Sequence, residues 1–348
     1  MRSSPPPPSP GLSRRTLLRA GAAGALAAPW IGRAAAATPE VINIAYFVET
    51  KPTMIAKGLG WFADEAKAKI NWTEAGSGAE INTAMAAGSV DIGLAIGSSP
   101  TAAGISQRLG YKLIGMVDNI GPAEEMTVRK SANIHTPADF KGKKVATPFG
   151  STSHFRLLGF LKLNGLSQRD VTVLDMRPDA IVAAWERGDI DAAYVWSPAK
   201  SKLLANGGEV YRTYDKLDAA GYVIADLIVA RSKFLDAYPD AVTGLLRAYG
   251  KALDMWQTEP QKAAEIVGKQ AGVSAEVAMA DLKEYDFVPL KQQLSSQWLG
   301  RPGKPGRFAD VLKTTADFLV EQHSIRSAPG VIAFQKATDT VPLSQAVG

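Results

Sequence analysis

Two stretches of the chain repeat one pattern 100 residues apart. Residues 80–91 (EINTAMAAGSVD) and 180–191 (AIVAAWERGDID) both place apolar side chains at positions i, i+3 and i+4, which predicts a helix with one apolar face. A glycine follows each helix, Gly88 and Gly188, where a helix end favours a residue with positive φ. The apolar positions are Ile81, Ala84 and Met85 in the first stretch and Ile181, Ala184 and Trp185 in the second.

Both stretches continue in the same way. A predicted strand follows each glycine and ends at a Ser-Pro pair, Ser99-Pro100 in one case and Ser197-Pro198 in the other. Serine before proline is typical of a helix start, with serine as the N-cap and proline at the first helical position. Chance recurrence in an α/β protein is the alternative, but the matching spacing and side chains favour a duplicated architecture. Two similar lobes predict a cleft between them.

Strands and helices alternate from residue 41 onward, which predicts an α/β fold with helices on the faces of a sheet. We expect a helix from Met54 to Ala68, a mainly helical stretch from Phe234 to Glu284, a looser stretch from Pro289 to Phe308 and a last helix from Phe308 to Gln322. A length of 348 residues suggests two domains. The predicted strands are Val41–Tyr46, Ile70–Glu74, Val90–Ile96, Lys112–Val117, Met126–Arg129, Lys144–Thr147, Val171–Asp175, Ile190–Trp196 and Leu227–Ala230.

The N-terminal segment, residues 1–37, predicts export. It combines the pair Arg14-Arg15, a short apolar run rich in Ala and Gly from Ala20 to Ile31, and the small residues Ala34–Ala37. This arrangement is typical of a signal peptide of the twin-arginine type, with a general secretory signal as the alternative. We expect cleavage near Ala37 and a soluble periplasmic protein without a lipid anchor.

Composition excludes several classes of protein. Residues 1–37 hold five of the 39 basic residues and no acidic one, so the rest of the chain carries 34 side chains of each sign. This balance removes the support for a nucleic-acid partner. The absence of cysteine excludes disulfides, thiolate catalysis and a lipidated N-terminal cysteine. The three histidines lie far apart in the sequence, so we expect no metal and no cofactor.

Hydroxyl-bearing residues follow three of the predicted strands, at the carboxyl ends where ligands collect in α/β folds. Each such junction offers free backbone N–H groups, the positive end of a helix and hydroxyl donors, which together suit an anion. Simple N-capping is the alternative for any single serine. The segments are Gly97-Ser98-Ser99-Pro100, Phe149-Gly150-Ser151-Thr152-Ser153-His154 and Ser197-Pro198.

Three carboxylates are candidates for the cleft. Asp226 interrupts the apolar run 222–230, and because a buried charge is costly unless paired, we expect it to face the cleft; a solvent-facing edge is the alternative. Glu49, just past the first strand, is a second candidate. Glu124 and Glu125 precede a strand, and for this pair we favour a solvated turn over a position in the cleft.

Aromatic residues and catalytic motifs complete the survey. Trp185, Tyr194 and Trp196 are candidates for the walls of the cleft, although such residues more often belong to the core. Ser153 and His154 are adjacent, so on a helix their side chains point about 100° apart, a poor geometry for a nucleophile and its base. The chain lacks a Gly-x-Ser-x-Gly elbow, a P-loop and a dinucleotide fingerprint. We expect no catalytic residue and no enzyme.

The segments Gly97–Pro100, Pro148–Phe155 and above all Ala180–Ala199 resemble the periplasmic taurine-binding proteins of bacterial ABC importers, within the aliphatic sulfonate-binding family. The similarity extends from about Val41 to the last predicted helix. It implies a two-lobe periplasmic-binding-protein fold of type II, with the ligand cleft between the lobes.

The resemblance also implies how the chain is divided. Residues 38–125 would form the first part of lobe 1, residues 126–225 lobe 2, and residues 226–348 the return to lobe 1 with the C-terminal helices. The two crossings between lobes would fall near Glu124–Arg129 and near Ala225–Val229.

The function implied by the resemblance is capture of taurine by closure of the lobes, for import as a source of sulfur. The partners would be a membrane permease and its ATPase, and the protein would act as a monomer. Asp226 would meet the ammonium group of the ligand. The residues expected around the sulfonate are Ser98, Ser99, Thr152, Ser153 and His154.

One residue departs from the family pattern. Just after the first strand we expect an acidic residue before proline, whereas this chain has Lys51-Pro52. A lysine there would weaken ammonium binding and favour a plain anion. The alternative ligands are therefore another alkanesulfonate, nitrate or an aromatic acid. The alternatives to import are an enzyme resembling thiamine-pyrimidine synthases, which the lack of cysteine disfavours, and a module that presents its ligand to a receptor.

Overall fold

The structure is a computed structural model that describes residues 3–4 and 37–348. The predicted signal peptide lies outside the described residues, apart from residues 3–4 and Ala37. Residues 37–348 form one compact unit. Within the described part of the chain, no helix has both the length and the apolar character needed to cross a membrane.

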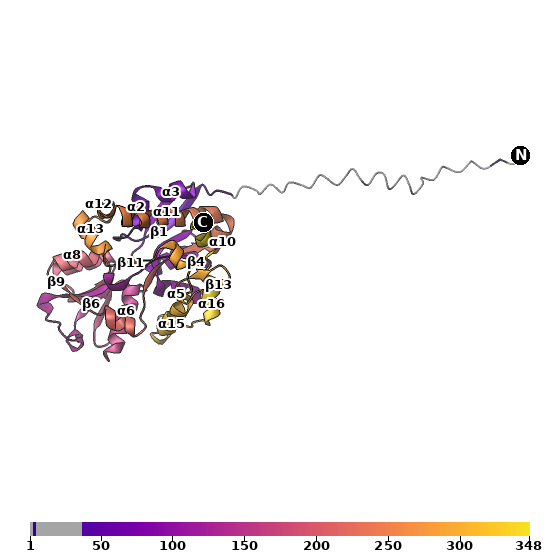
Figure 1. The fold of residues 1–348 in the computed structure, drawn as a ribbon. Coiled ribbons are helices and arrows are strands. Elements are labelled where there is room, and N and C mark those ends of the chain that lie inside the picture. The colour runs from indigo at the N-terminus through magenta and orange to yellow at the C-terminus, as the bar shows by residue number, and fades with distance from the viewer. Residues whose placement is uncertain (1–2, 5–36) are drawn as a thin grey trace. The chain divides into compact units, whose positions relative to one another are not determined.

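A six-stranded sheet with its packed helices forms the part that we call lobe 1 (Figure 1). The strand order is β11-β4-β10-β3-β1-β2. Strand β1 pairs in parallel with β2 and β3, whereas β10 runs antiparallel between β3 and β4. The strands are β1 (Val41–Tyr46), β2 (Lys69–Glu74), β3 (Ile92–Gly97), β4 (Tyr111–Asn119), β10 (Ala225–Arg231) and β11 (Asp286–Phe287).

A five-stranded sheet with its helices forms lobe 2, in the order β7-β6-β8-β5-β9. Strand β6 pairs in parallel with β7 and β8, and β5 runs antiparallel to β8 and β9. Each sheet thus has a parallel set of strands with one antiparallel strand inserted, and lobe 1 adds the short edge strand β11, which pairs antiparallel with β4. The strands are β5 (Glu125–Arg129), β6 (Lys144–Thr147), β7 (Thr172–Asp175), β8 (Ala192–Val195) and β9 (Gly208–Tyr211); a separate hairpin joins β12 (Gly300–Arg301) and β13 (Lys304–Pro305).

Helices cover both faces of the sheet in lobe 1, with α2, α3, α11 and α12 on one side of β1 and α5, α15 and α16 on the other (Figure 1). The helices are α2 (Thr53–Gly58), α3 (Trp61–Ala66), α4 (Gly78–Ala87), α5 (Ser98–Ser106), α6 (Thr152–Leu163), α7 (Pro178–Arg187), α8 (Ala199–Ala205), α9 (Tyr214–Ala219), α10 (Ser232–Ala237), α11 (Pro239–Thr258), α12 (Pro260–Ala271), α13 (Ala275–Leu282), α14 (Leu290–Gln293), α15 (Phe308–Glu321), α16 (Val331–Ala337) and α17 (Val341–Ala346), with 3-10 turns at Gly121–Ala123, Lys130–Ala132 and Pro137–Phe140.

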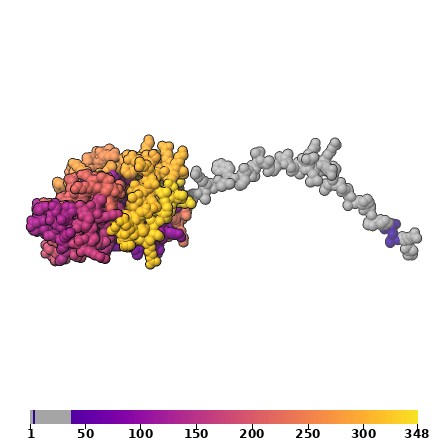
Figure 2. Space-filling model, turned by 90° about the horizontal axis from the view of Figure 1, so that it is seen from below, coloured from indigo at the N-terminus to yellow at the C-terminus, as the bar shows by residue number. Residues whose placement is uncertain are grey.

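The chain passes between the sheets twice. It leaves lobe 1 after β4 and enters lobe 2 at β5, and it returns at β10. We keep the predicted division at residues 125/126 and 225/226 as a proposal. In Figure 2 lobe 2, in magenta, adjoins the C-terminal helices, in yellow, and the contact includes an ion pair of 2.6 Å between Lys162 of α6 and Glu321 of α15.

The duplicated architecture is confirmed. Helices α4 and α7 span positions that differ by 100 residues, and both end at a glycine in the left-handed conformation, Gly88 at φ +75° and Gly188 at φ +78°. Each glycine N–H donates to the carbonyls three and four residues earlier, which satisfies the end of the helix. The strands β3 and β8 then follow at the same offset.

The prediction of one continuous helix over residues 54–68 was wrong, because two shorter helices occupy this stretch. Helix α2 ends at Gly58, and α3 begins at Trp61 after Gly60, whose φ of +76° is a left-handed conformation that interrupts a right-handed helix. The helix predicted to be the last, 308–322, corresponds to α15, but two short helices, α16 and α17, follow it and pack against β4.

The prediction that both Ser-Pro pairs cap helices was also wrong. Helix α5 begins at Ser98 with Gly97 as its N-cap, so Ser99 lies inside the helix and its hydroxyl is free to bond elsewhere. Helix α8 begins after Pro198, and the Ser197 hydroxyl pairs at 2.9 Å with that of Ser201.

Candidate functional site

A cavity lies between the two lobes, beyond the end of β3. Its enclosed space is about 20 Å³, which is enough for about one water molecule. A larger ligand therefore enters only if the lobes separate. The cavity is lined by Phe47, Glu49, Lys51, Gly97, Pro100, Ile120, Asp226 and Tyr285 on the lobe 1 side and by Glu124, Ser151, Thr152 and Trp196 toward lobe 2, with Gly78 and Ala95 behind.

The start of helix α6 forms the lobe 2 wall. After β6 the chain turns through Gly150, at φ +69°, and Ser151 caps the helix by accepting a hydrogen bond of 3.1 Å from the His154 N–H. The Ser151 hydroxyl itself donates to the Pro148 carbonyl at 2.6 Å. The next residue, Thr152, donates from its hydroxyl to Glu124 Oε2 at 2.9 Å.

The start of helix α5 meets it from lobe 1. The Ser99 hydroxyl donates across the lobes to the Ser151 carbonyl at 2.9 Å. A Cβ atom on Gly97 would lie 2.6 Å from the Thr152 Cγ2, so glycine permits this close approach. The first N–H groups of a helix have no partner within the helix, and the helix dipole is positive there. Two such ends thus converge at one wall of the cavity.

A cluster of carboxyl groups and one lysine forms a further wall, next to the start of α5, because Asp226 of β10 is the register partner of Gly97. Asp226 of β10 and Asp118 of β4 are register partners on adjacent strands. The Lys51 ammonium contacts the Asp226 carboxylate and lies 2.9 Å from Asp118 Oδ2 and 3.6 Å from Glu49 Oε2. The same Nζ atom lies 4.5 Å from the centroid of the Tyr285 ring. We call these five residues the charged cluster; all of them are buried.

Burial controls the protonation of these groups. It raises the pKa of Glu49 to about 7, against the opposing effect of the Lys51 charge, and it raises the pKa values of Asp118 and Asp226 as well. Burial lowers the pKa of Lys51, but the three surrounding carboxyl groups outweigh this and raise it above the usual value. Burial and the nearby Asp226 raise the pKa of Glu124 to about 7. The cavity therefore combines one firmly charged ammonium with two carboxyl groups, Glu49 and Glu124, whose pKa values lie near neutral pH.

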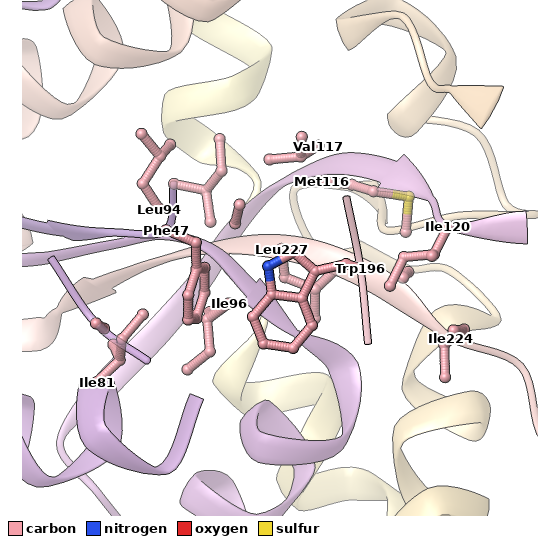
Figure 3. Close-up of a cluster of buried hydrophobic side chains, with 14 of the residues drawn as sticks. Phe47, Ile81, Leu94, Ile96, Met116, Val117, Ile120, Trp196, Ile224 and Leu227 are labelled. Carbon is pink, nitrogen blue, oxygen red and sulfur yellow. The ribbon is translucent and has the colours of Figure 1, made fainter. Parts of the chain in front are cut away.

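The three predicted aromatic residues separate into one at the cavity and two in the core. Trp196 packs edge to face on Phe47, with ring centroids 5.6 Å apart, and Figure 3 shows it among apolar side chains of lobe 1. Trp185 donates to the Asn206 carbonyl at 2.8 Å within lobe 2. Tyr194 pairs with the Thr213 hydroxyl at 2.9 Å, also within lobe 2.

Four of the residues predicted to contact the sulfonate, Ser98, Ser99, Ser153 and His154, do not line the cavity. The Ser98 hydroxyl accepts from the Ala225 N–H at 3.3 Å, and Ser99 is engaged with Ser151. The Ser153 hydroxyl is buried and has no hydrogen-bond partner among the described residues. His154 stacks on Phe149 at 4.3 Å and lines a separate groove between α4, α5, α6 and α15; burial lowers its pKa to about 4. Thr152 alone of the predicted hydroxyls lines the cavity.

The solvated turn favoured for Glu124 and Glu125 was wrong, because both residues are 2% exposed. Glu124 lines the cavity, whereas Glu125 accepts hydrogen bonds from the backbone of Thr213 and Tyr214 in lobe 2. The adjacent acids are thus divided between two environments.

Sequence reasoning missed Asp118, Phe47 and Tyr285, among other residues of the site. Asp118 interrupts the apolar strand β4 as Asp226 interrupts β10, so the same signal could have found it. Phe47 and Tyr285 lie in segments with no distinguishing pattern. No group of three or more His, Cys, Asp or Glu side chains suited to a metal ion occurs among residues 3–4 and 37–348.

Comparison with known proteins places the chain among binding proteins. The family described as NMT1/THI5 like matches residues 48–263. The taurine-binding periplasmic protein of Escherichia coli K12 is 31% identical over 82% of this chain and 87% of its own length. A putative aliphatic sulfonates-binding protein of Bacillus subtilis 168 is 30% identical over 63% of this chain and 65% of its own length.

Solved structures agree on the fold. The alkanesulfonate-binding protein SsuA from Xanthomonas axonopodis pv. citri, bound to MOPS, superposes with a TM-score of 0.73 over 88% of this chain and 100% of that chain, at 23% identity. The implied fold is confirmed as the α/β, two-lobe periplasmic-binding-protein fold of type II, with the ligand cleft between the lobes.

Proposed function

The chain belongs to the NMT1/THI5-like family, and on that premise we propose that it is the extracytoplasmic substrate-binding protein of an ABC importer that captures a small sulfonate. It acts in the periplasm as a monomer, after export directed by residues 1–37 through the twin-arginine route. It passes its ligand unchanged to a membrane permease with its ATPase, as a step in sulfur metabolism. The similarity to taurine-binding and sulfonate-binding proteins supports this proposal.

The observation that carries the proposal is the convergence of α5 and α6 at one wall of the cavity. A sulfonate is a permanent anion that needs hydrogen-bond donors. Free N–H groups at two helix starts supply donors there without requiring a positively charged side chain, and the Thr152 hydroxyl adds one when it turns from Glu124 Oε2 to the ligand. The Ser98, Ser99 and Ser153 positions contribute through the backbone of these first helical turns, and His154 supports the α6 turn.

Capture proceeds by closure. In the open form each lobe presents half of the site, and the ligand stabilises the closed form by contacting both halves. Contacts that already bridge the lobes in this structure, Ser99 to Ser151 and Phe47 to Trp196, belong to that closed form. Trp185 and Tyr194 stiffen lobe 2 behind the site.

Taurine is the first ligand to test, because the chain shares 31% sequence identity with the taurine-binding protein of Escherichia coli and because Asp226 lines the cavity. The other candidates are an alkanesulfonate without an amino group, nitrate and an aromatic acid. The cavity discriminates among them by charge and size.

Titration calorimetry with taurine, ethanesulfonate, nitrate and benzoate tests the function. We expect at least one sulfonate to bind more tightly than nitrate and benzoate. Thr152→Val should weaken sulfonate binding about tenfold, since a hydrogen bond to a charged group contributes about 1.5–3 kcal/mol. Thr258→Val is the matched control, because that hydroxyl bonds only within α11, to the Asp254 carbonyl at 2.9 Å. Tight binding of nitrate or benzoate with no response to either sulfonate would overturn the proposal.

A further inference from the structure

The carboxyl groups of the charged cluster already surround a cation that belongs to the protein. The Lys51 ammonium contacts Asp226 and lies within 3.6 Å of both Asp118 and Glu49. An ammonium has three N–H donors, and three carboxyl groups face this one, with the Tyr285 ring on a further side. The lysine thus fills the position that a small ammonium group on a ligand would need.

The backbone fixes Lys51 in this position. Pro52 and the start of α2 follow immediately, and the Lys51 carbonyl accepts from the Met54 N–H at 2.9 Å. The Lys51 side chain is 2% exposed, so its ammonium is shielded from solvent in this arrangement. A ligand that carried its own ammonium would place a second positive charge beside it, in a buried site where like charges repel strongly.

We infer that Lys51 replaces the ammonium of an aminosulfonate, so that this protein selects sulfonates without an amino group. The inference rests on the proposed function and narrows its ligand class. Asp226 then holds Lys51 in place rather than contacting the ligand.

The remaining titratable groups explain how the cavity accepts an anion. Glu49 and Glu124 have pKa values raised to about 7 by burial, so near neutral pH each can carry a proton. An incoming anion favours their protonated forms, whereas an incoming ammonium favours their ionised forms. A plain sulfonate should therefore bind with uptake of protons. The groups that face the cavity or its charged cluster are Glu49, Lys51, Asp118, Glu124, Asp226, Tyr249 and Tyr285, with Arg156 behind Glu124.

Ethanesulfonate and taurine differ only in the amino group, so their affinities test the inference directly. We expect the wild-type protein to bind ethanesulfonate at least tenfold more tightly than taurine. Lys51→Met should reverse this order, because it frees Asp226 and Asp118 for the ammonium of taurine. Lys57→Met is the matched control: this lysine lies one turn along α2, with its Nζ 4.7 Å from the Tyr46 ring centroid and outside the cavity. It should leave the ratio unchanged.

Two further measurements test the inference if Lys51→Met cannot be studied. If Lys51→Met does not fold, the double variant Lys51→Met/Asp226→Asn serves in its place, because it removes both charges. We expect this variant to show no preference for taurine over ethanesulfonate. Calorimetry of the wild-type protein in two buffers of different ionisation enthalpy should show proton uptake with ethanesulfonate at pH 7. A wild-type preference for taurine, or a ratio unaffected by Lys51→Met, would overturn the inference. If neither sulfonate binds to any variant, the proposed function itself fails.

Discussion

The two lobes share a framework and differ in what they present to the cavity. In both, a helix ends at a left-handed glycine, and an aspartate immediately before the next strand ties that strand to its neighbour. The Asp91 carboxylate accepts from the Asn43 N–H at 3.0 Å, and the Asp191 carboxylate accepts from the Lys144 N–H at 2.8 Å. Such contacts depend on local geometry, which a duplication preserves.

The lobes diverge just beyond the duplicated strands. Strand β3 leads through Gly97 directly into α5, whereas β8 is followed by Trp196 and Pro198 before α8 begins. Lobe 1 also carries the charged cluster, while lobe 2 offers the start of α6. Under the proposed function, the framework supports closure, and the residues assigned to ligand selection lie in the parts that are not duplicated.

The largest expected effect is a loss of stability when a buried side chain of the duplicated helices is removed. Met85 and Trp185 occupy matching positions in α4 and α7, and both are buried. We expect Trp185→Ala to lower the free energy of unfolding by about 3–5 kcal/mol and Met85→Ala by about 2–5 kcal/mol, because each leaves a void in its lobe. Chemical denaturation measures both values.

The contrast is with Trp196→Ala, which alters the cavity. Among the molecules that remain folded, the Trp185 and Met85 variants should keep the ligand affinity, whereas Trp196→Ala should lose it through the Phe47 contact. A change in affinity for Trp185→Ala equal to that for Trp196→Ala would mean that the core and cavity roles are not separate.

The second effect concerns the buried carboxyl group at the junction of the lobes. Burial raises the pKa of Glu124 from 4.5 to about 7 in the folded state. The folded protein therefore binds this proton more tightly than the unfolded chain, so stability falls as pH rises from about 4.5 to 7 and stays low above that range. We expect Glu124→Gln to raise the free energy of unfolding at pH 8 by up to about 3 kcal/mol, and to change it little at pH 4.5. Denaturation at the two pH values checks this, and an equal effect at both would contradict it.

The same carboxyl group shows where sequence reasoning stops. Adjacent acids such as Glu124 and Glu125 are usually exposed, so the local pattern favoured a solvated turn. Their burial depends on partners far away in sequence, Thr152 for one and Thr213 for the other. The repeat, by contrast, was predictable because helix periodicity and the glycine ends are local features.

The charged residues also differ in whether local sequence or the tertiary fold determines their role. The cost of a charge within an apolar strand pointed to Asp226, and the same argument applied to β4 would have found Asp118. The resemblance to taurine-binding proteins marked Lys51 as a departure, but its pairing with a residue 175 positions away depends on the tertiary fold. Likewise, Trp185 and Trp196 lie in one continuous block, and only packing decides that one belongs to the core and the other to the cavity.

A third effect tests the close approach of the lobes. A Cβ atom at Gly97 would lie 2.6 Å from Thr152 Cγ2, so Gly97→Ala should hinder closure. We expect ligand affinity to fall by about tenfold or more, consistent with about 1–3 kcal/mol for overpacking. Gly110→Ala is the control, since a Cβ atom there meets nothing within 4 Å. Unchanged affinity for Gly97→Ala would show that the bound form is more open than this structure.

The smallest effect concerns an ion pair that joins the two duplicated helices. Arg177, just before α7, lies 2.6 Å from Glu80 in the first turn of α4, and both side chains are more than 40% exposed. Exposed ion pairs contribute about 0.2–1 kcal/mol, so Arg177→Gln should weaken ligand binding less than about fivefold, and the difference should vanish at high salt. Arg187→Gln is the control, because its partner Asp189, at 2.8 Å, lies within the same lobe. If both variants weaken binding equally, the bridge between the lobes makes no specific contribution to closure, and the contacts at the cavity wall alone hold the closed form.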